Sequence, residues 1–292
     1  MLADGSRPAP DVDTLDDGAG PWDPRWAVLA ACPAAEADLS RARARGAAVG
    51  GHGLPSQRRR PGPVAVSWVE ELPWTAVGRV DVPGGWASGV LVGPRHLLTA
   101  SHVVAWEAAS AGEGDPLRRV DAGWLRFAPA ASGALTPYGS ASGLRALAPL
   151  AVVPPTIEAH EERYDYAVVV LDSRIGEVAG WLAVRPYEER WDRESLWTLA
   201  GYRGEDALSA RPVAVPRLAL LGHEGHSDDS QTIYHDALAD VGLSGGPLLG
   251  RWPGDEHPSV VAVQSWSNQF LSGACGGHKL VELVERARAE HP

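Results

Sequence analysis

The chain has 292 residues, about the length of two ordinary domains, and 45% of them are apolar, which is enough for a sizeable core. Its 26 Lys and Arg residues against 37 Asp and Glu residues leave a net charge of −11, so we expect neither a nucleic-acid partner nor binding to an anionic membrane. No stretch of 18 apolar residues occurs, which predicts no membrane-spanning helix.

The N-terminal part of the sequence predicts an appendage rather than a core. Residues 1–22 are acidic and rich in Gly and Pro, a composition that buries little surface. Residues 24–32 and 34–47 have short helical patterns, and the stretch that ends in Arg58–Arg60 is typical of a linker. We therefore predict an N-terminal extension and linker over residues 1–63, partly helical or loose.

From residue 64 onward, short apolar runs alternate with Gly, Pro, Asp and Ser, as in β-strands joined by turns. These runs are Val64–Val69, Thr75–Val80, Ala87–Val92, Trp124–Phe127, Tyr166–Leu171, Trp197–Ala200, Val213–Leu221 and Val260–Trp266. Many short strands favour an antiparallel sandwich or barrel. Residues 279–290 then switch to helical spacing, and Leu280, Leu283, Val284 and Ala287 form one apolar face.

Three other features concern the compartment and metal chemistry. The first residues lack the basic-then-apolar layout of a secretion signal, and we expect a cytoplasmic protein. Two cysteines, Cys32 and Cys275, cannot form a disulfide framework or a four-thiolate metal site. The stretch His223–His226 does not have the spacing of a helical zinc motif and predicts a polar loop. We therefore expect no metal and no cofactor.

Three segments carry the residue types that acyl transfer by a serine needs. His102 follows a strand-like run, Asp165 opens an apolar strand, and Ser244 lies among glycines. In such a reaction a base removes the hydroxyl proton, an acid orients the base, and backbone N–H groups face the developing oxyanion. The three segments supply these parts in the order His, Asp, Ser.

The segments Leu98–His102 and Gly242–Pro247 resemble the histidine and serine signatures of trypsin-like (chymotrypsin-fold) serine peptidases, and Tyr164–Val168 resembles their aspartate strand. The sequence is most similar to the bacterial glutamyl-endopeptidase-like branch, and the similarity covers residues 64–290. Further similar segments are Trp74–Arg79, Ser88–Pro94, Gly201–Gly204 and Ser265–Trp266.

This resemblance implies an all-β, chymotrypsin-like fold of two six-stranded antiparallel β-barrels, with the active site in the cleft between them. The peptidase domain would cover residues 64–292. Its first barrel would span 64–172, its second barrel 173–278, and its C-terminal helix 279–290. The spacing from His102 to Asp165 is long for the family and predicts an insertion within residues 107–160.

The resemblance also assigns roles. His102 would be the general base, Asp165 its orienting acid and Ser244 the nucleophile, with the backbone N–H groups of Gly242 and Ser244 as the oxyanion hole. Asp172 and Asp192 stay open as alternative acids.

The substrate pocket implied by the resemblance consists of Leu238, Ala239, Gln264, Ser265, Trp266 and Ser267. Leu238 stands where an enzyme that cuts after arginine or lysine carries an acid, and Gln264 and Ala239 stand where glutamyl endopeptidases carry histidine and threonine. We therefore expect an apolar or small pocket, while Asp236 and Asp240 nearby keep a cationic preference open.

The sequence thus predicts a serine endopeptidase that hydrolyses peptide bonds of protein substrates through an acyl-enzyme on Ser244. It resembles intracellular bacterial peptidases that process a dedicated partner protein, for instance in defence systems, and the extension would then occlude the cleft or dock the partner. One alternative is a catalytically silent pseudopeptidase that binds proteins, although the triad is intact. Another is an esterase-type α/β-hydrolase, whose nucleophile motif Gly242-x-Ser244-x-Gly246 also matches; Pro247 argues against the helix that this motif needs.

Overall fold

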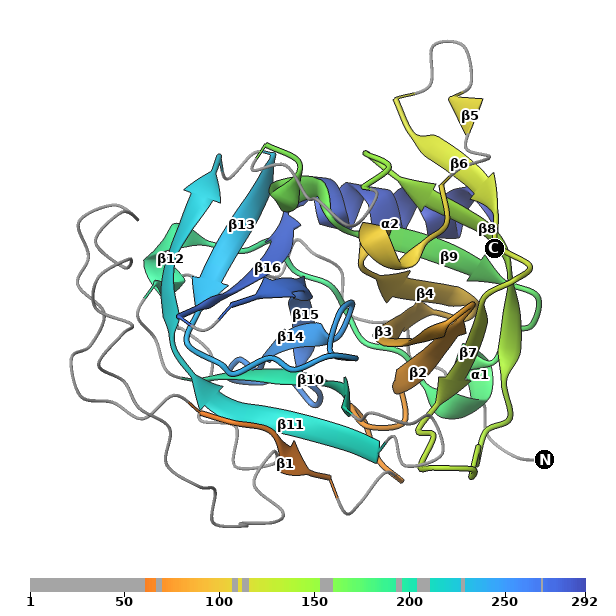
Figure 1. The fold of residues 1–292 in the computed structure, drawn as a ribbon, viewed down its shortest axis with the longest axis horizontal. Helices are drawn as coiled ribbons and strands as arrows, with labels where there is room; N and C mark the ends of the chain where they lie inside the picture. The colour runs from red at the N-terminus through yellow and green to blue at the C-terminus, as the bar shows by residue number, and fades with distance from the viewer. Residues whose placement is uncertain are drawn as a thin grey trace.

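The computed structural model describes residues 61–66, 70–106, 110–111, 116–152, 160–192, 196–203, 211–226, 229–268 and 270–292. In this part the chain is almost all β, and two antiparallel sheets stand side by side (Figure 1). The predicted all-β class is confirmed. The helices predicted at residues 24–32 and 34–47 lie outside the described residues.

The first sheet contains a closed six-stranded barrel. Its strands are β2 (Val77–Val82), β3 (Gly85–Gly93), β4 (His96–Thr99), β7 (Arg126–Pro129), β8 (Ala141–Ala148) and β9 (Ala167–Leu171). They pair in the order β8-β7-β2-β3-β4-β9, and a further pairing of β8 with β9 closes the ring. Two more strands, β5 (Ser110–Ala111) and β6 (Arg118–Asp121), extend the sheet beyond β8 and fall inside the predicted insertion.

The second sheet has eight strands rather than the six expected of its barrel. They are β1 (Val64–Ala65), β10 (Trp197–Arg203), β11 (Arg211–Leu218), β12 (Leu220–Gly225), β13 (Ser230–His235), β14 (Pro247–Gly250), β15 (Ser259–Ser267) and β16 (Ser272–Gly277). The order is β1-β11-β10-β14-β15-β16-β13-β12. Only Ala219 separates β11 from β12, which lie near opposite ends of this order, so the sheet has to curl until its ends meet.

The short strand β1 pairs with β11 of the second sheet, with Val64 opposite Ala214. The sequence analysis placed this segment at the start of the first barrel. An apolar run shows that a segment is a strand and which face is buried, but it does not show which strand becomes its partner.

The protein has two apolar cores: one fills the first barrel and continues onto second-sheet residues such as Leu249 and Val263, and the other belongs to the second sheet. In the second core three tryptophans pack together, with ring centroids 5.0 Å apart for Trp191 and Trp252, 5.4 Å for Trp191 and Trp197, and 6.0 Å for Trp197 and Trp252. Aromatic rings at these distances add to the stability that their burial gives.

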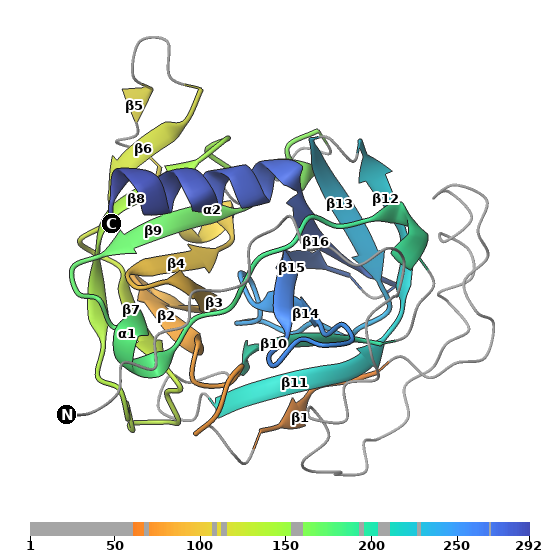
Figure 2. The same cartoon turned by 180° about the vertical axis from the view of Figure 1, so that it is seen from behind.

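The helix α2 (His278–Glu290) begins directly after β16 and lies across both sheets (Figure 2). It contacts β4, β8 and β9 of the first sheet and β13 and β16 of the second. Its buried side chains are Leu280, Val281, Leu283, Val284 and Ala287, which confirms the predicted apolar face. A second, very short helix, α1 (Gly176–Ala179), lies in the connection between the barrels.

Hydrogen bonds fix α2 to the first barrel. The Nε2 atom of His96 lies 3.2 Å from the carbonyl oxygen of Ala287, and the guanidinium of Arg288 donates to the carbonyl of Val92 at 2.6 Å. Burial, followed by the charge of Arg288, lowers the pKa of His96 to about 4. The imidazole is therefore neutral at pH 7 and lies beside the half-buried Arg288 without repulsion.

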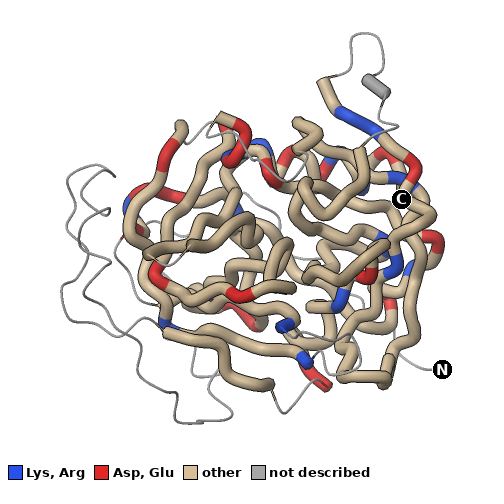
Figure 3. The backbone as a smooth tube through the Cα atoms, viewed as in Figure 1, with Lys and Arg blue, Asp and Glu red and all other residues tan. Residues whose placement is uncertain are grey.

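Charged side chains of both signs are interspersed over the described backbone, and no continuous basic stripe crosses it in the view of Figure 3. None of the described helices has the length and apolar character required to cross a bilayer.

Candidate active site

The pairing of β4 with β9 brings the predicted base and acid to the same end of the first barrel. In this antiparallel pair Thr99 lies opposite Ala167. His102 lies in the 3₁₀ helix Ser101–Val103 that follows β4, and Asp165 directly precedes Tyr166 and β9. Because antiparallel strands run in opposite directions, a residue after the first strand and a residue before the second meet at one edge.

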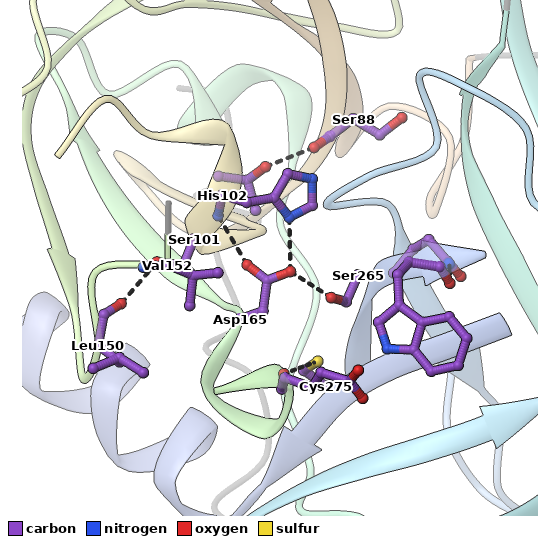
Figure 4. A network of polar contacts seen from close by, with 12 residues as sticks. Ser88, Ser101, His102, Leu150, Val152, Asp165, Ser265 and Cys275 are labelled. Atoms are coloured by element: carbon purple, nitrogen blue, oxygen red, sulfur yellow. Dashed lines mark hydrogen bonds and ion pairs between the residues drawn. The ribbon is translucent and has the colours of Figure 1, made fainter. Parts of the chain in front are cut away.

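His102 and Asp165 are joined by two hydrogen bonds (Figure 4). The Nδ1 atom of His102 lies 2.7 Å from Oδ2, and its backbone N–H donates to Oδ1 at 2.8 Å. Asp165 is fully buried, whereas 17% of the His102 side chain is exposed. A carboxylate at Nδ1 favours the tautomer with the proton on that atom, so Nε2 is left as a proton acceptor.

A third hydrogen bond to Asp165 comes from the second sheet. The hydroxyl of Ser265 on β15 donates to Oδ2 of Asp165 (Figure 4). Cys275 on β16 is fully buried, and its thiol donates to the carbonyl of Glu162 at 2.6 Å. Burial, and then the nearby Asp165, raise the pKa of this thiol, which therefore stays protonated.

Ser244 lies in a tight loop, Asp240–Gly246, which we call the serine loop. Within it the N–H of Leu243 donates to the carbonyl of Asp240 at 3.2 Å, and the N–H of Gly246 donates to the carbonyl of Leu243 at 2.9 Å. The N–H groups of Gly242 and Ser244 donate to no acceptor within the described part of the protein.

The serine loop packs directly against the turn that carries His102. A Cβ atom on Gly245 would lie 2.1 Å from Oγ1 of Thr99 and 2.8 Å from the backbone N of Ala100. Ser244 is half-buried, and its carbonyl accepts a hydrogen bond from the N–H of Ser88 at 2.8 Å. Among the described residues no hydrogen bond joins Ser244 Oγ to His102 Nε2, and neither atom has another hydrogen-bond partner.

The residues predicted for the substrate pocket differ in exposure. Leu238 is exposed, and its N–H donates to the carbonyl of Pro61 at 3.0 Å. Ala239 and Trp266 are half-buried, and the indole of Trp266 covers Gly273, where a Cβ atom would lie 2.5 Å from the ring. Ser267 is exposed, and its hydroxyl accepts a hydrogen bond at 2.8 Å from the hydroxyl of Ser272 on the neighbouring strand β16.

The polar groups near this pocket are engaged with other parts of the protein. Gln264 is buried, and its Oε1 lies 2.9 Å from Nε2 of His235. The carboxylate of Asp236 accepts from the N–H of Ala219 at 2.7 Å, and Asp240 forms an ion pair with Arg203 at 2.7 Å.

The comparisons with known proteins fit this geometry. No protein-family model matches the sequence, and no curated protein does. A solved Glu endopeptidase in complex with MPD superimposes with a TM-score of 0.60 at 19% identity, over 78% of this chain and 97% of its own. The fold is that of the trypsin-like serine proteases.

Two further solved structures with the trypsin-like fold also superimpose on this chain. The protease Anisep from Arthrobacter nicotinovorans has a TM-score of 0.51 at 18% identity and covers 75% of this chain and 98% of its own. The thermostable serine protease AL20 from an extremophilic microorganism has a TM-score of 0.52 at 15% identity and covers 74% and 98%.

The two alternative acids, Asp172 and Asp192, contact residues other than His102. Asp172 is exposed and accepts from the N–H of Ser142 at 3.1 Å, and Asp192 contacts His223 at 3.2 Å. The described part holds no group of three His, Cys, Asp or Glu side chains arranged to bind a metal. After Ser244 the chain forms the strand β14, where an α/β-hydrolase has a helix.

Two contacts of the site were missed by the sequence analysis. It assigned Ser265 only to the pocket wall, whereas the hydroxyl contacts Asp165. Ser88 was quoted only as part of a strand, and its contacts with the serine loop leave no local signal because 154 residues separate it from Gly242.

Proposed function

We propose that the protein is a serine endopeptidase that hydrolyses peptide bonds of protein substrates through an acyl-enzyme on Ser244. The observation that carries the proposal is the pair of hydrogen bonds from His102 to the buried Asp165, next to a loop whose Gly242 and Ser244 N–H groups have no acceptor in the described part. The trypsin-like fold supports it, because the structures with this fold that were compared are proteases.

The reaction would proceed in two halves. Nε2 of His102 takes the proton from Ser244 Oγ while Oγ bonds to the substrate carbonyl carbon, and the carbonyl oxygen becomes an oxyanion that faces the N–H groups of Gly242 and Ser244. When the C–N bond breaks, Nε2 gives its proton to the leaving amine, and the acyl-enzyme remains. Water then attacks the ester after losing a proton to Nε2, and this proton returns to Ser244 Oγ as the acid product leaves.

For the pocket we propose a preference for an uncharged side chain before the scissile bond. Asp236 and Asp240 are both bonded within the protein, and Leu238 stands at the position that would hold an acid in an enzyme specific for basic residues. A digest of a proteome-derived peptide library tests this preference, and cleavage confined to sites after Arg, Lys or Glu would contradict it.

Labelling by a peptidyl phosphonate tests the function itself. We expect the wild-type protein to form a covalent adduct on Ser244, and the variant Ser244→Ala to form none, as read by intact mass. Ser173→Ala is the matched control, because Ser173 is exposed on the surface after β9 and should leave labelling unchanged. If the folded wild-type protein takes no label, the proposal fails in favour of a pseudopeptidase that binds proteins. If Ser244→Ala is labelled equally, the label lies on another nucleophile and the assignment of Ser244 is wrong.

The proposal extends to regulation and compartment. The carbonyl of Pro61 bonds to the N–H of Leu238, so the N-terminal extension joins the described protein at the predicted pocket. We propose a cytoplasmic bacterial protease that the extension restrains until a dedicated partner protein is engaged, for example in a defence system. The absence of a disulfide framework from the sequence supports the reducing compartment.

Removal of residues 1–60 tests this restraint. We expect the truncated protein, which keeps Pro61 and β1, to react with the phosphonate faster than the full chain at the same concentration. The thermal midpoint of both proteins, followed by circular dichroism, controls for damage to the fold. Equal labelling rates in two equally stable proteins would rule the restraint out.

A further inference from the structure

The hydroxyl of Ser88 lies at the junction between the first barrel and the serine loop. Ser88 is on β3 of the first sheet and is fully buried. Its Oγ donates to the carbonyl of Gly242 at 2.7 Å and accepts from the N–H of Tyr202 at 2.7 Å. Its backbone N–H donates to the carbonyl of Ser244 at 2.8 Å, and its carbonyl accepts from the hydroxyl of Thr99 at 2.8 Å. Every polar atom of this residue is therefore engaged.

Two of these bonds hold peptide groups that lie next to the ones carrying the N–H groups of Gly242 and Ser244. The peptide between Gly242 and Leu243 is held at its oxygen by Ser88 Oγ and at its nitrogen by the carbonyl of Asp240. Ser88 N–H holds the carbonyl of Ser244 itself. One peptide group at Gly242 and one at Ser244 are thereby held by a residue of the first barrel.

Gly242 needs such an outside contact. Its φ of 94° lies in the left-handed region, which glycine adopts freely, so the residue alone does not select one orientation of its peptide groups. A rotated peptide would aim the N–H of Gly242 away from the N–H of Ser244, and the two donors would no longer face one point. Donors fixed before the reaction stabilise an oxyanion far better than donors that must reorient.

The surrounding residues leave space for a hydroxyl at this place and little more. A Cβ atom on Gly201 would lie 2.6 Å from Ser88 Oγ and 3.0 Å from Ser88 Cβ. The glycine before Tyr202 therefore lets the Ser88 hydroxyl reach the N–H of Tyr202 and the carbonyl of Gly242 together.

We propose that Ser88 is a positioning residue for the oxyanion hole, and that its hydroxyl holds the Gly242 carbonyl so that the N–H groups of Gly242 and Ser244 point to the same oxygen. The inference rests on the proposed peptidase function. Ser88 touches neither the substrate nor the reacting atoms, and it acts through the serine loop.

The variant Ser88→Ala tests this role. It keeps the backbone bond to Ser244 but removes the hydroxyl from Gly242. We expect kcat to fall by about 100-fold while KM changes by less than about threefold, because the lost contact acts on the transition state. A peptide aldehyde, which forms a hemiacetal with its oxygen in the oxyanion hole, should lose affinity by about the same factor. A product-like peptide acid of the same sequence should bind with unchanged affinity.

Ser101→Ala is the matched control for simple loss of a buried hydroxyl. Ser101 is also fully buried, and its Oγ likewise donates to one backbone carbonyl, that of Leu150 at 2.8 Å, and accepts from one N–H, that of Val152 at 3.2 Å. It should lower the thermal midpoint without lowering aldehyde affinity. If Ser88→Ala loses no more aldehyde affinity than Ser101→Ala, the positioning role is overturned. Failure of the peptidase function itself is a separate result, because the wild-type protein would then show neither turnover nor phosphonate labelling.

Discussion

Replacement of Asp165 by asparagine is expected to lower kcat for a peptide substrate by about 10⁴-fold and to leave the fold intact. The amide has the shape of the carboxylate but turns an NH₂ donor toward His102, which shifts the imidazole proton to Nε2. A protonated Nε2 in the neutral ring cannot accept the proton of Ser244, so the base is lost although its position is kept. Steady-state kinetics on a peptide substrate measure the loss of kcat, and near-ultraviolet circular dichroism tests whether the fold is intact.

Asp172→Asn is the control for this experiment. Asp172 lies directly after β9, at the opposite end of the strand from Asp165, and among the described residues its carboxylate accepts only the N–H of Ser142. We expect kcat to stay at the wild-type value. A protein that keeps its activity in Asp165→Asn, or loses it in Asp172→Asn, would show that the acid has been misassigned.

Gly245→Ala is expected to abolish phosphonate labelling and to lower the free energy of unfolding by about 3–5 kcal/mol. The added Cβ would lie 2.1 Å from Thr99 Oγ1 and 2.4 Å from the carbonyl oxygen of Ser88, and the φ of 79° is itself unfavourable for alanine. The serine loop must therefore move away from the turn that carries His102. Urea unfolding and intact-mass labelling give the two readouts.

The variant Gly254→Ala separates the cost of the left-handed backbone from the cost of the close contact with Thr99. Gly254 has a φ of 88°, but a Cβ atom there meets nothing within 4 Å. This variant should lose only the about 1–2 kcal/mol that a left-handed backbone costs a residue with a side chain, and should label normally. If Gly245→Ala and Gly254→Ala lose the same free energy of unfolding, the contact of the added Cβ with Thr99 contributes nothing to the loss.

The sequence was sufficient where a short segment determines its own structure. The apolar run before His102 forms β4, the run after Asp165 forms β9, and the helical face of residues 280–287 is buried as predicted. The order of the three motifs also led to the correct fold, because each motif lies within a few consecutive residues.

The sequence was insufficient where two distant segments meet. Nothing in Val64–Ala65 shows that this strand pairs with β11 rather than with the first barrel. In the same way, a serine before a tryptophan gives no sign that Ser265 donates to an aspartate 100 residues earlier in the chain. Gln264, which the resemblance assigns to the pocket, is buried and bonded to His235, and no local pattern predicts that bond. Such contacts depend on how the two sheets dock, which no single segment encodes.

The hydrogen bonds that Asp165 and the serine loop receive from opposite sheets have a consequence for biosynthesis. A nascent chain that has completed only its first barrel has the base and the acid, but it has neither the nucleophile nor the hydroxyl of Ser265. Proteolytic competence would arise in one step, when the second sheet closes against the first.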